Sequence, residues 1–310
     1  MSATSPSAIC GIRFGAAYYA EYERNADIER DFDLMVGAGF TVIRVGESVW
    51  STWEPRDGEF ALEWLLPILD AAHQRGIGVI LGTATYAAPP WLQKKHPEIA
   101  AERATGIRAN WGGRQEMDYS SPVFLRYAER LVRTVIERYA AHPAVIGFQV
   151  DNEPGLELFH NAGAFERFVH QLEKTYGTVD SLNREWGLTY WSHRINSFDE
   201  LWVPDGNTLP QYDLAWRRFQ AQLTTEFITW QAEIVREYSR ADQFVTTCIA
   251  YPRPALDDVK LAAGLDVTAA NCYYGMQDHL AVGRDLQPIT PWSTTGVWGL
   301  YRQADRVWSS

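Results

Sequence analysis

The sequence predicts an α/β fold built as a (β/α) barrel, and two observations carry this prediction. Short apolar runs alternate with longer amphipathic stretches along the 310 residues, which is typical of a parallel sheet with helices on the outside. No glycine-rich dinucleotide fingerprint follows the first apolar run, and the sequence contains no phosphate-binding P-loop motif. A barrel is therefore favoured over a doubly wound nucleotide-binding fold.

The expected elements follow in chain order. Strands are expected at 11–19, 41–46, 77–85, 144–150, 243–250 and 265–274. Helices are expected at 25–40, 62–76 and 122–142, with a long helical insertion at about 155–240 and a last helix over 294–310. The chain is thus expected to form one domain over 1–310. It is an incomplete (β/α)8 barrel that holds strands one to six and lacks strands seven and eight.

Composition excludes several classes of protein. The net charge of −11 argues against binding to nucleic acid or to anionic membranes, because both need clustered Lys and Arg. Three widely spaced cysteines form neither a disulfide framework nor a metal-binding pair. No signal peptide and no apolar run of membrane-spanning length is visible, so a soluble cytoplasmic protein is expected.

Polar and aromatic residues follow the predicted strands, at the end where a parallel barrel carries its chemistry. In "GFQVDNEPG" (147–155) an apolar run ends in Asp151, Asn152 and Glu153. A helix-capping role for Glu153 would explain one such strand end, but the agreement of five favours a pocket. The five strand ends are Tyr18 to Glu21, Gly46 to Ser48, Thr83 to Tyr86, Asp151 to Glu153, and Asn271 to Tyr274.

Four segments make the chain similar to glycoside hydrolase family 42, the microbial β-galactosidases with an N-terminal (β/α)8 barrel. The similarity runs from about residue 11 to the end of the chain. The segments are "GESVWSTWEPRDGEF" (46–60), "APPWLQKKHPE" (88–98), "GFQVDNEPG" (147–155) and "YGTVDSLNREWGLTYWSHRINSFDEL" (176–201).

The resemblance implies a retaining mechanism with two carboxylates about 5 Å apart. Glu153 would be the acid/base, which protonates the leaving oxygen and then deprotonates water. Asn152 would hydrogen-bond the sugar, at its 2-hydroxyl. Arg114 would orient the sugar and the carboxylates, and Trp191 and Tyr273 would line the pocket.

Simpler interpretations of these residues remain open. Arg114 could be a surface residue of a loop, and Trp191 could be a packing residue beside Trp186. Tyr274 competes with Tyr273 for the pocket position.

Two further residues, Glu47 and Tyr18, lie at the same predicted rim. Glu47 could contact a ligand, or it could form a buried structural ion pair with Arg44 or Arg114. The sequence alone leaves these alternatives undecided.

The chain departs from the family pattern in two ways. Some members bind zinc through a cysteine cluster, but Asp118 stands at one of its positions and no cysteine follows Glu153 closely. No zinc, and no other metal or cofactor, is therefore expected. The family nucleophile is a glutamate on strand seven, whereas no glutamate follows Glu237. The chain is therefore expected to be inactive alone, either as a fragment of a longer protein or as a barrel that has lost catalysis.

Three functions compete at this stage. The first is a β-galactosidase barrel with a small-molecule galactoside as its partner, in a homo-oligomer that by resemblance is a trimer. The second is a sugar-binding remnant of the same barrel without catalysis. The third, a retaining barrel glycosidase acting on mannosides or glucans, would share the Asn-Glu pair but not the segment at 176–201.

Overall fold

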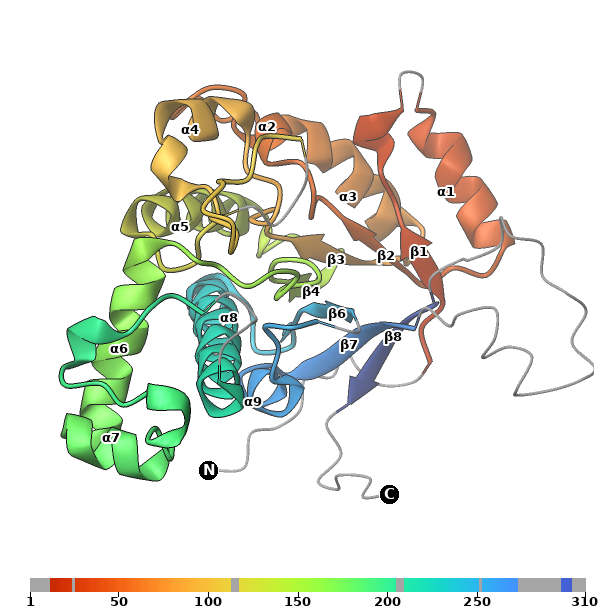
Figure 1. Ribbon diagram of the computed structural model, residues 1–310. Helices are drawn as coiled ribbons and strands as arrows, with labels where there is room; N and C mark the ends of the chain where they lie inside the picture. Colours follow the sequence, from red (N-terminus) through yellow and green to blue (C-terminus); the bar gives the residue numbers. More distant parts are fainter. Residues whose placement is uncertain are drawn as a thin grey trace, which may run out of the picture.

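A computed structural model describes residues 12–23, 26–112, 117–204, 209–250, 253–272 and 297–302. Its centre is a five-stranded sheet in the order β1-β2-β3-β4-β5, and every neighbouring pair is parallel (Figure 1). The strands are β1 (Gly15–Ala17), β2 (Val42–Val45), β3 (Gly78–Gly82), β4 (Val145–Gln149) and β5 (Phe244–Thr246). Because each strand pairs with the next in sequence, the chain winds in one direction, as in a barrel wall.

A second, three-stranded sheet continues this wall. It consists of β6 (Cys248–Ala250), β7 (Val267–Cys272) and β8 (Val297–Arg302), of which β6 and β7 are parallel. The expected strand at 243–250 is therefore two strands separated by Thr247. The two sheets meet where the Asp266 N–H donates to the Val245 carbonyl oxygen at 3.0 Å and the Val245 N–H donates to Asp266 Oδ2 at 2.8 Å.

The helix expected over 294–310 is wrong for the part that the structure describes. Residues 297–302 form β8, which pairs antiparallel with β7 along its whole length. The segment "VWGLYR" is rich in β-branched and aromatic residues, which favour a strand when an open sheet edge is available. That edge is contributed by β7, which the local sequence of 297–302 does not reveal.

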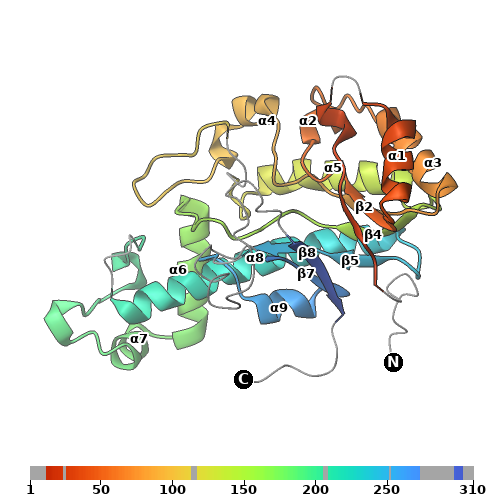
Figure 2. The same ribbon diagram turned by 90° about the vertical axis from the view of Figure 1, so that its right-hand side faces the viewer.

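Helices lie between the strands and cover the outer side of the sheet (Figures 1 and 2). α5 begins where Pro122 occupies the first turn and the Ser121 side chain accepts a hydrogen bond from the Phe124 N–H at 3.4 Å. The helices are α1 (Ile28–Gly37), α2 (Trp50–Trp53), α3 (Leu66–Gln74), α4 (Pro90–Lys95), α5 (Pro122–Tyr139), α6 (Ala162–Tyr176), α7 (Val179–Glu185), α8 (Pro210–Tyr238) and α9 (Asp258–Ala263). Short 3₁₀ turns are η2 (Ala20–Tyr22), η3 (Glu63–Leu65), η4 (Pro97–Ile99), η5 (Tyr190–Ser192) and η6 (Phe198–Glu200).

α8 joins two hydrophobic cores. Its C-terminal half packs against the sheet through Phe227, Ile228 and Val235. Its N-terminal half contributes Trp216 and Phe219 to a smaller core formed with α6 and α7. With 29 residues, α8 is about 44 Å long, which lets one helix belong to both cores (Figure 2).

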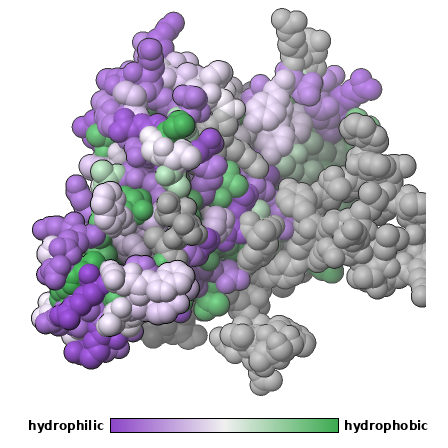
Figure 3. Space-filling view, viewed as in Figure 1, coloured by the Kyte–Doolittle hydropathy of each residue, from purple (hydrophilic) through white to green (hydrophobic). Residues whose placement is uncertain are grey.

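Hydrophilic residues cover most of the described surface on the side seen in Figure 3, and hydrophobic residues lie among them in small groups. Within the described ranges, no helix is both long enough and apolar enough to cross a membrane.

Gly82 at the end of β3 lets Glu47 pack directly against the backbone of that strand. A Cβ atom on Gly82 would lie 2.2 Å from Glu47 Cβ and 2.4 Å from Glu47 Cα. Glu47 follows β2 and Gly82 pairs with Gln149 of β4. The missing side chain thus leaves room for residues of β2 and β4 to meet across β3.

We expect Gly82→Ala to destabilise the fold by about 2 kcal/mol or more, because the added methyl would meet backbone rather than a movable side-chain end. Denaturant unfolding would measure this cost. Gly37→Ala in α1 is the matched control, since a Cβ atom there meets nothing within 4 Å, and it should leave stability equal or slightly higher. Equal stability of the Gly82→Ala and Gly37→Ala proteins would contradict the packing described for Gly82.

Candidate active site

A strained turn follows β4 and carries the Asn-Glu pair. Asp151 has φ 54° and Glu153 has φ 49°, both in the left-handed region that costs non-glycine residues free energy. The turn is fixed by the Asp151 N–H, which donates to Thr83 Oγ1 at 2.9 Å, and by the Glu153 N–H, which donates to the Cys248 carbonyl oxygen at 2.8 Å. Strain held in this way clusters at functional sites.

Glu153 lies in the mouth of the barrel with only 4% of its surface exposed. Arg253 Nη2 donates to Glu153 Oε2 at 2.9 Å, and Asn271 Nδ2 donates to Glu153 Oε1. Asn271 belongs to β7, and Arg253 follows β6. Two elements from the second sheet therefore orient the carboxylate that the sequence singles out at the end of β4.

Asn152 is buried beside Glu153 and is linked to the opposite side of the mouth. Gln149 Nε2 donates to Asn152 Oδ1 at 3.2 Å and to the Asp151 carbonyl oxygen at 2.9 Å. Arg44 Nη1 of β2 donates to Gln149 Oε1 at 2.9 Å. A continuous set of hydrogen bonds thus runs from β2 to the Asn-Glu pair.

Buried acidic side chains lie around Arg44. Glu47 is 1% exposed and pairs with Arg44 at 3.1 Å, and the Tyr19 hydroxyl donates to the same carboxylate oxygen. The ion pair between Glu47 and Arg44, one of the two alternatives from the sequence, is confirmed. Glu47 Oε2 and both carboxylate oxygens of Glu21 are buried without a hydrogen-bond partner among the described residues. Burial, with the charge of Glu47 added, raises the pKa of Glu21 to about 7.

Asp151 and Tyr119 are two further buried groups whose pKa values are raised by burial. Burial raises the pKa of Asp151 to about 6, although Thr85 Oγ1, at 2.7 Å, and the Asn152 N–H, at 2.8 Å, donate to its carboxylate. Gln231 Oε1 of α8 lies 3.0 Å from Thr85 Oγ1 and is a second acceptor within reach of the single Thr85 hydroxyl proton. Burial, and then the charge of Asp151, raises the pKa of Tyr119 well above 10.0, its ordinary value, while the charge of Arg253 lowers it.

The structure describes three of the five residues that the resemblance assigns to the site. Asn152 and Glu153 lie together in the mouth, as above. Arg114 and Tyr273 lie outside the described residues, as does Tyr274. Trp191 is 77% exposed on η5, where it stacks on Tyr190 with ring centroids 4.9 Å apart. Trp191 thus projects from the helical region and makes no ring contact with Trp186.

Tyr18 directly follows β1, as expected, but its hydroxyl donates to Asp31 Oδ2 of α1 at 2.8 Å, so its side chain points to the helix and not to the mouth. Its neighbour Tyr19 points to the mouth, where its hydroxyl donates to Glu47. Sequence reasoning also missed Gln149 and Arg253. Gln149 had a signal, because it is the one polar side chain within the apolar run 145–150. The sequence gives no such signal for Arg253, because its position depends on the loop that follows β6.

Asp118 stands where some family members have a zinc-binding cysteine, and in the structure it binds a neighbouring residue of its own loop. The Ser120 N–H and hydroxyl donate to Asp118 Oδ1 at 2.8 and 2.6 Å. In the part of the chain that the structure describes, no group of three or more His, Cys, Asp or Glu side chains could hold a metal ion.

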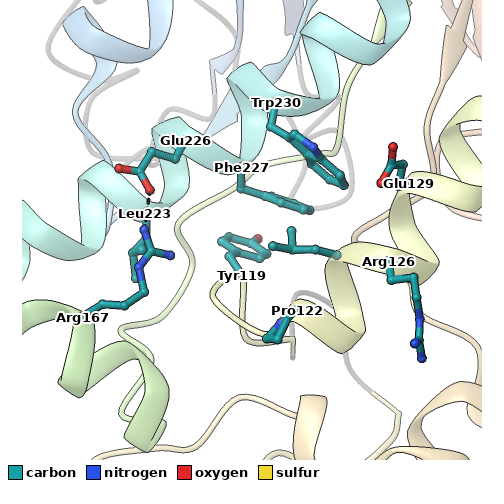
Figure 4. Close-up of a pocket in the computed structure, with 10 residues that line it drawn as sticks. Tyr119, Pro122, Arg126, Glu129, Arg167, Leu223, Glu226, Phe227 and Trp230 are labelled. Atoms are coloured by element: carbon teal, nitrogen blue, oxygen red, sulfur yellow. Dashed lines mark hydrogen bonds and ion pairs between the residues drawn. The ribbon is translucent and has the colours of Figure 1, made fainter.

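A cavity of about 360 Å³ lies between α5, α6 and α8, apart from the Asn-Glu pair (Figure 4). Its carboxylates are paired with arginines, Glu226 with Arg167 at 2.7 Å and Glu129 with Arg133 at 2.8 Å. Phe227 stacks on Tyr119 at its inner wall. The cavity therefore offers packing surface and no unpaired carboxylate for acid/base chemistry.

A parallel barrel wall with a buried Asn-Glu pair after its fourth strand is the arrangement that the resemblance to the barrel glycoside hydrolases implies. The chain belongs to glycoside hydrolase family 42, whose family model, described as beta-galactosidase, matches residues 17–293. It is 35% identical to a beta-galactosidase of Arthrobacter sp. over 89% of this chain and 34% identical to one of Thermus thermophilus, also over 89%. The resemblance drawn from the sequence is confirmed.

Solved structures confirm the predicted α/β barrel class. The beta-galactosidase of Halorubrum lacusprofundi matches with a TM-score of 0.81 and 31% identity over 89% of this chain and 42% of its own. The catalytic domain of a Paenibacillus polymyxa beta-amylase, at 12% identity and a TM-score of 0.61, shares the fold. The chain spans 41% and 43% of the Arthrobacter and Thermus thermophilus relatives.

Asp151 should make stability depend on pH. Its folded-state pKa of about 6 lies above the ordinary 3.8, so the folded state binds the proton more tightly than the unfolded chain does. This contribution is fully present below about pH 4 and is lost as the pH rises through about 6. The free energy of unfolding of Asp151→Asn should therefore equal that of the native protein near pH 4. At pH 7 it should be larger than that of the native protein by on the order of 2–3 kcal/mol.

The amide is accommodated because Thr85 can turn its proton to Gln231 Oε1 and accept from the new Nδ2. Denaturant unfolding at a series of pH values would measure the difference. Asp199→Asn, at an exposed position, is the control and should show no such trend. A difference between Asp151→Asn and the native protein that stays constant from pH 4 to pH 7 would count against a proton held by Asp151.

Proposed function

We propose that this chain carries the acid/base side of a retaining β-galactosidase site, with Glu153 as the acid/base and Asn152 as a sugar ligand. The observation that supports this most is the burial of both side chains at the carboxyl end of β4, in a chain of family 42. The relatives named above are beta-galactosidases, which makes a terminal β-galactoside the proposed substrate.

The proposed chemistry has two steps at Glu153. As the bond to the leaving group breaks, Glu153 gives its proton to the departing oxygen, and it later takes a proton from the water that attacks the sugar. Arg253, which follows β6, and Asn271 of β7 hold its two carboxylate oxygens, which fixes the direction from which the proton is delivered. General acid catalysis depends on that direction as much as on acidity.

A retaining site also needs a second carboxylate as nucleophile. Three buried carboxylates already have partners: Asp151 binds Thr85, Glu47 binds Arg44 and Tyr19, and Asp118 binds Ser120. We propose that the nucleophile is none of these. The family position for it, a glutamate on a seventh strand, has no counterpart in the sequence, in which no glutamate follows Glu237.

We expect Glu153→Gln, made in the protein at its natural length, to slow hydrolysis of alkyl β-galactosides by roughly 10²–10⁴, the range for a lost general acid. Aryl galactosides with good leaving groups should lose less in the first step, since they need less proton assistance. Steady-state and pre-steady-state rates on both substrates would test this. Glu166→Gln on the exposed face of α6 is the control and should keep native rates. An unchanged rate on alkyl galactosides would remove Glu153 from the mechanism.

We expect the 310 residues by themselves to give no turnover of an aryl β-galactoside, because no glycosyl-enzyme can form without a second carboxylate. Binding of galactose without turnover would agree with this expectation and with the alternative of a sugar-binding remnant. Robust turnover would contradict it. In that case Glu21→Gln and Glu47→Gln would show whether either residue is the nucleophile.

A further inference from the structure

We infer that Gln149 is a positioning residue that sets the direction of the Asn152 side-chain amide, so that Asn152 meets the sugar as a hydrogen-bond donor. The inference deepens the proposed function and rests on it where the sugar is concerned. The direction of the two amides rests on the protein alone. It follows in two steps from groups whose donor or acceptor character cannot change.

The first step fixes the amide of Gln149 from both ends. Arg44 can only donate, so the atom of Gln149 that lies 2.9 Å from Arg44 Nη1 must be the carbonyl oxygen Oε1. The carbonyl oxygen of Asp151 can only accept, so the atom 2.9 Å from it must be Nε2. A reversed amide would place two donors together at Arg44 and two acceptors together at Asp151.

The second step passes this direction to Asn152. The other proton of Gln149 Nε2 points to Asn152, whose nearest atom at 3.2 Å must therefore accept and is Oδ1. Asn152 Nδ2 then lies on the other branch of the amide. Whatever Nδ2 contacts, a sugar hydroxyl included, has to accept a hydrogen bond from it.

The arrangement is held rigidly enough to impose this direction. The side chain of Gln149 is fully buried, where an unmatched amide would be costly. Arg44 is itself held by Glu47 at 3.1 Å and by the Tyr19 hydroxyl at 3.2 Å. Gly82 leaves the space in which these groups meet across β3.

A donor at this position selects for an acceptor on the sugar. If Asn152 faces the 2-hydroxyl, as the resemblance implies, that hydroxyl accepts from Nδ2 and keeps its own proton for another partner. Hydrogen bonds to the 2-hydroxyl strengthen in the transition state of glycoside hydrolysis. Gln149, which does not touch the sugar in this account, would thus act on the rate through Asn152.

The test is Gln149→Glu in the protein at its natural length, assayed on an aryl β-galactoside and on its 2-deoxy analogue. The carboxylate keeps an acceptor for Arg44 but has no proton for Asn152 Oδ1, so the Asn152 amide should reverse and present Oδ1 to the sugar. We expect kcat/KM to fall roughly 10²-fold on the galactoside, in the range for one misplaced donor. On the 2-deoxy substrate, which has no hydroxyl to receive the donor, it should change only a few fold. Equal losses on both substrates would overturn the inference.

Gln220→Glu is the matched control. Gln220 is also buried, and its amide accepts from the Phe159 N–H at 2.9 Å and donates to the Phe159 carbonyl oxygen at 2.8 Å, away from the Asn-Glu pair. It should lower the melting temperature without changing the ratio of kcat/KM between the two substrates. If Gln220→Glu changed the ratio of kcat/KM on the two substrates as much as Gln149→Glu does, the loss of any buried amide donor would explain the effect, and the role given to Gln149 would be wrong.

Neutron diffraction of the native protein with exchanged deuterons separates this inference from the proposed function. We expect deuterons on Gln149 Nε2 that point to the Asp151 carbonyl oxygen and to Asn152 Oδ1. Deuterons on Asn152 that point to Gln149 would overturn the inference whatever the activity. If no form of the protein cleaves a galactoside, the proposed function fails, and the neutron map still decides the direction of the amides.

Discussion

The buried guanidinium of Arg44 is the constraint on which the mouth of the barrel depends. Its side chain is only 14% exposed, and a buried charge must be matched by partners on every side. Burial by itself would lower the pKa of Arg44, but the charge of Glu47 and the nearness of Tyr19 raise it overall, so the group stays charged. Tyr19, Glu47 and Gln149 lie at the ends of β1, β2 and β4. Because all three bind the Arg44 guanidinium, that one group holds three strand ends close together.

The helical region reaches the same place from the outside through α8. Its N-terminal half is fixed in the small core around Trp216, and its C-terminal half delivers Gln231 to the end of the sheet. Gln231 Oε1 accepts from Thr83 Oγ1 at 2.8 Å, and Thr83 Oγ1 in turn accepts from the Asp151 N–H. The position of α8 is therefore coupled to the turn that carries Glu153. A long helix that belongs to two cores gives a firmer support for such a contact than a loop would.

The sequence predicted the elements whose pattern is local. The strands β2, β3 and β4 and the helix α5 have continuous apolar runs or a clear helical period, and the Asn-Glu pair stood out because polar residues end a buried strand. The failures all involve partners distant in sequence. β8 depends on the free edge of β7, the direction of the Tyr18 side chain depends on the position of α1, and Arg253 reaches Glu153 from 100 residues away. Gln149 was visible as a polar residue in an apolar run, but its role needs the three-dimensional position of Arg44.

The left-handed backbone at Asp151 and Glu153 explains why three polar residues end the apolar run. In an extended strand, neighbouring side chains point to opposite sides, so Asn152 and Glu153 could not both reach the mouth. Two left-handed residues cost on the order of 1–3 kcal/mol each. Three hydrogen bonds offset that cost: Gln149 Nε2 donates to the Asp151 carbonyl oxygen, the Asp151 N–H donates to Thr83 Oγ1, and the Glu153 N–H donates to the Cys248 carbonyl oxygen. The turn bends the chain so that Asn152 contacts Gln149 on the β2 side while Glu153 contacts Asn271 on the β7 side. Asp151 makes the turn possible by accepting from the Asn152 N–H and from Thr85, so the three residues act together: one holds the bend and two face the mouth of the barrel.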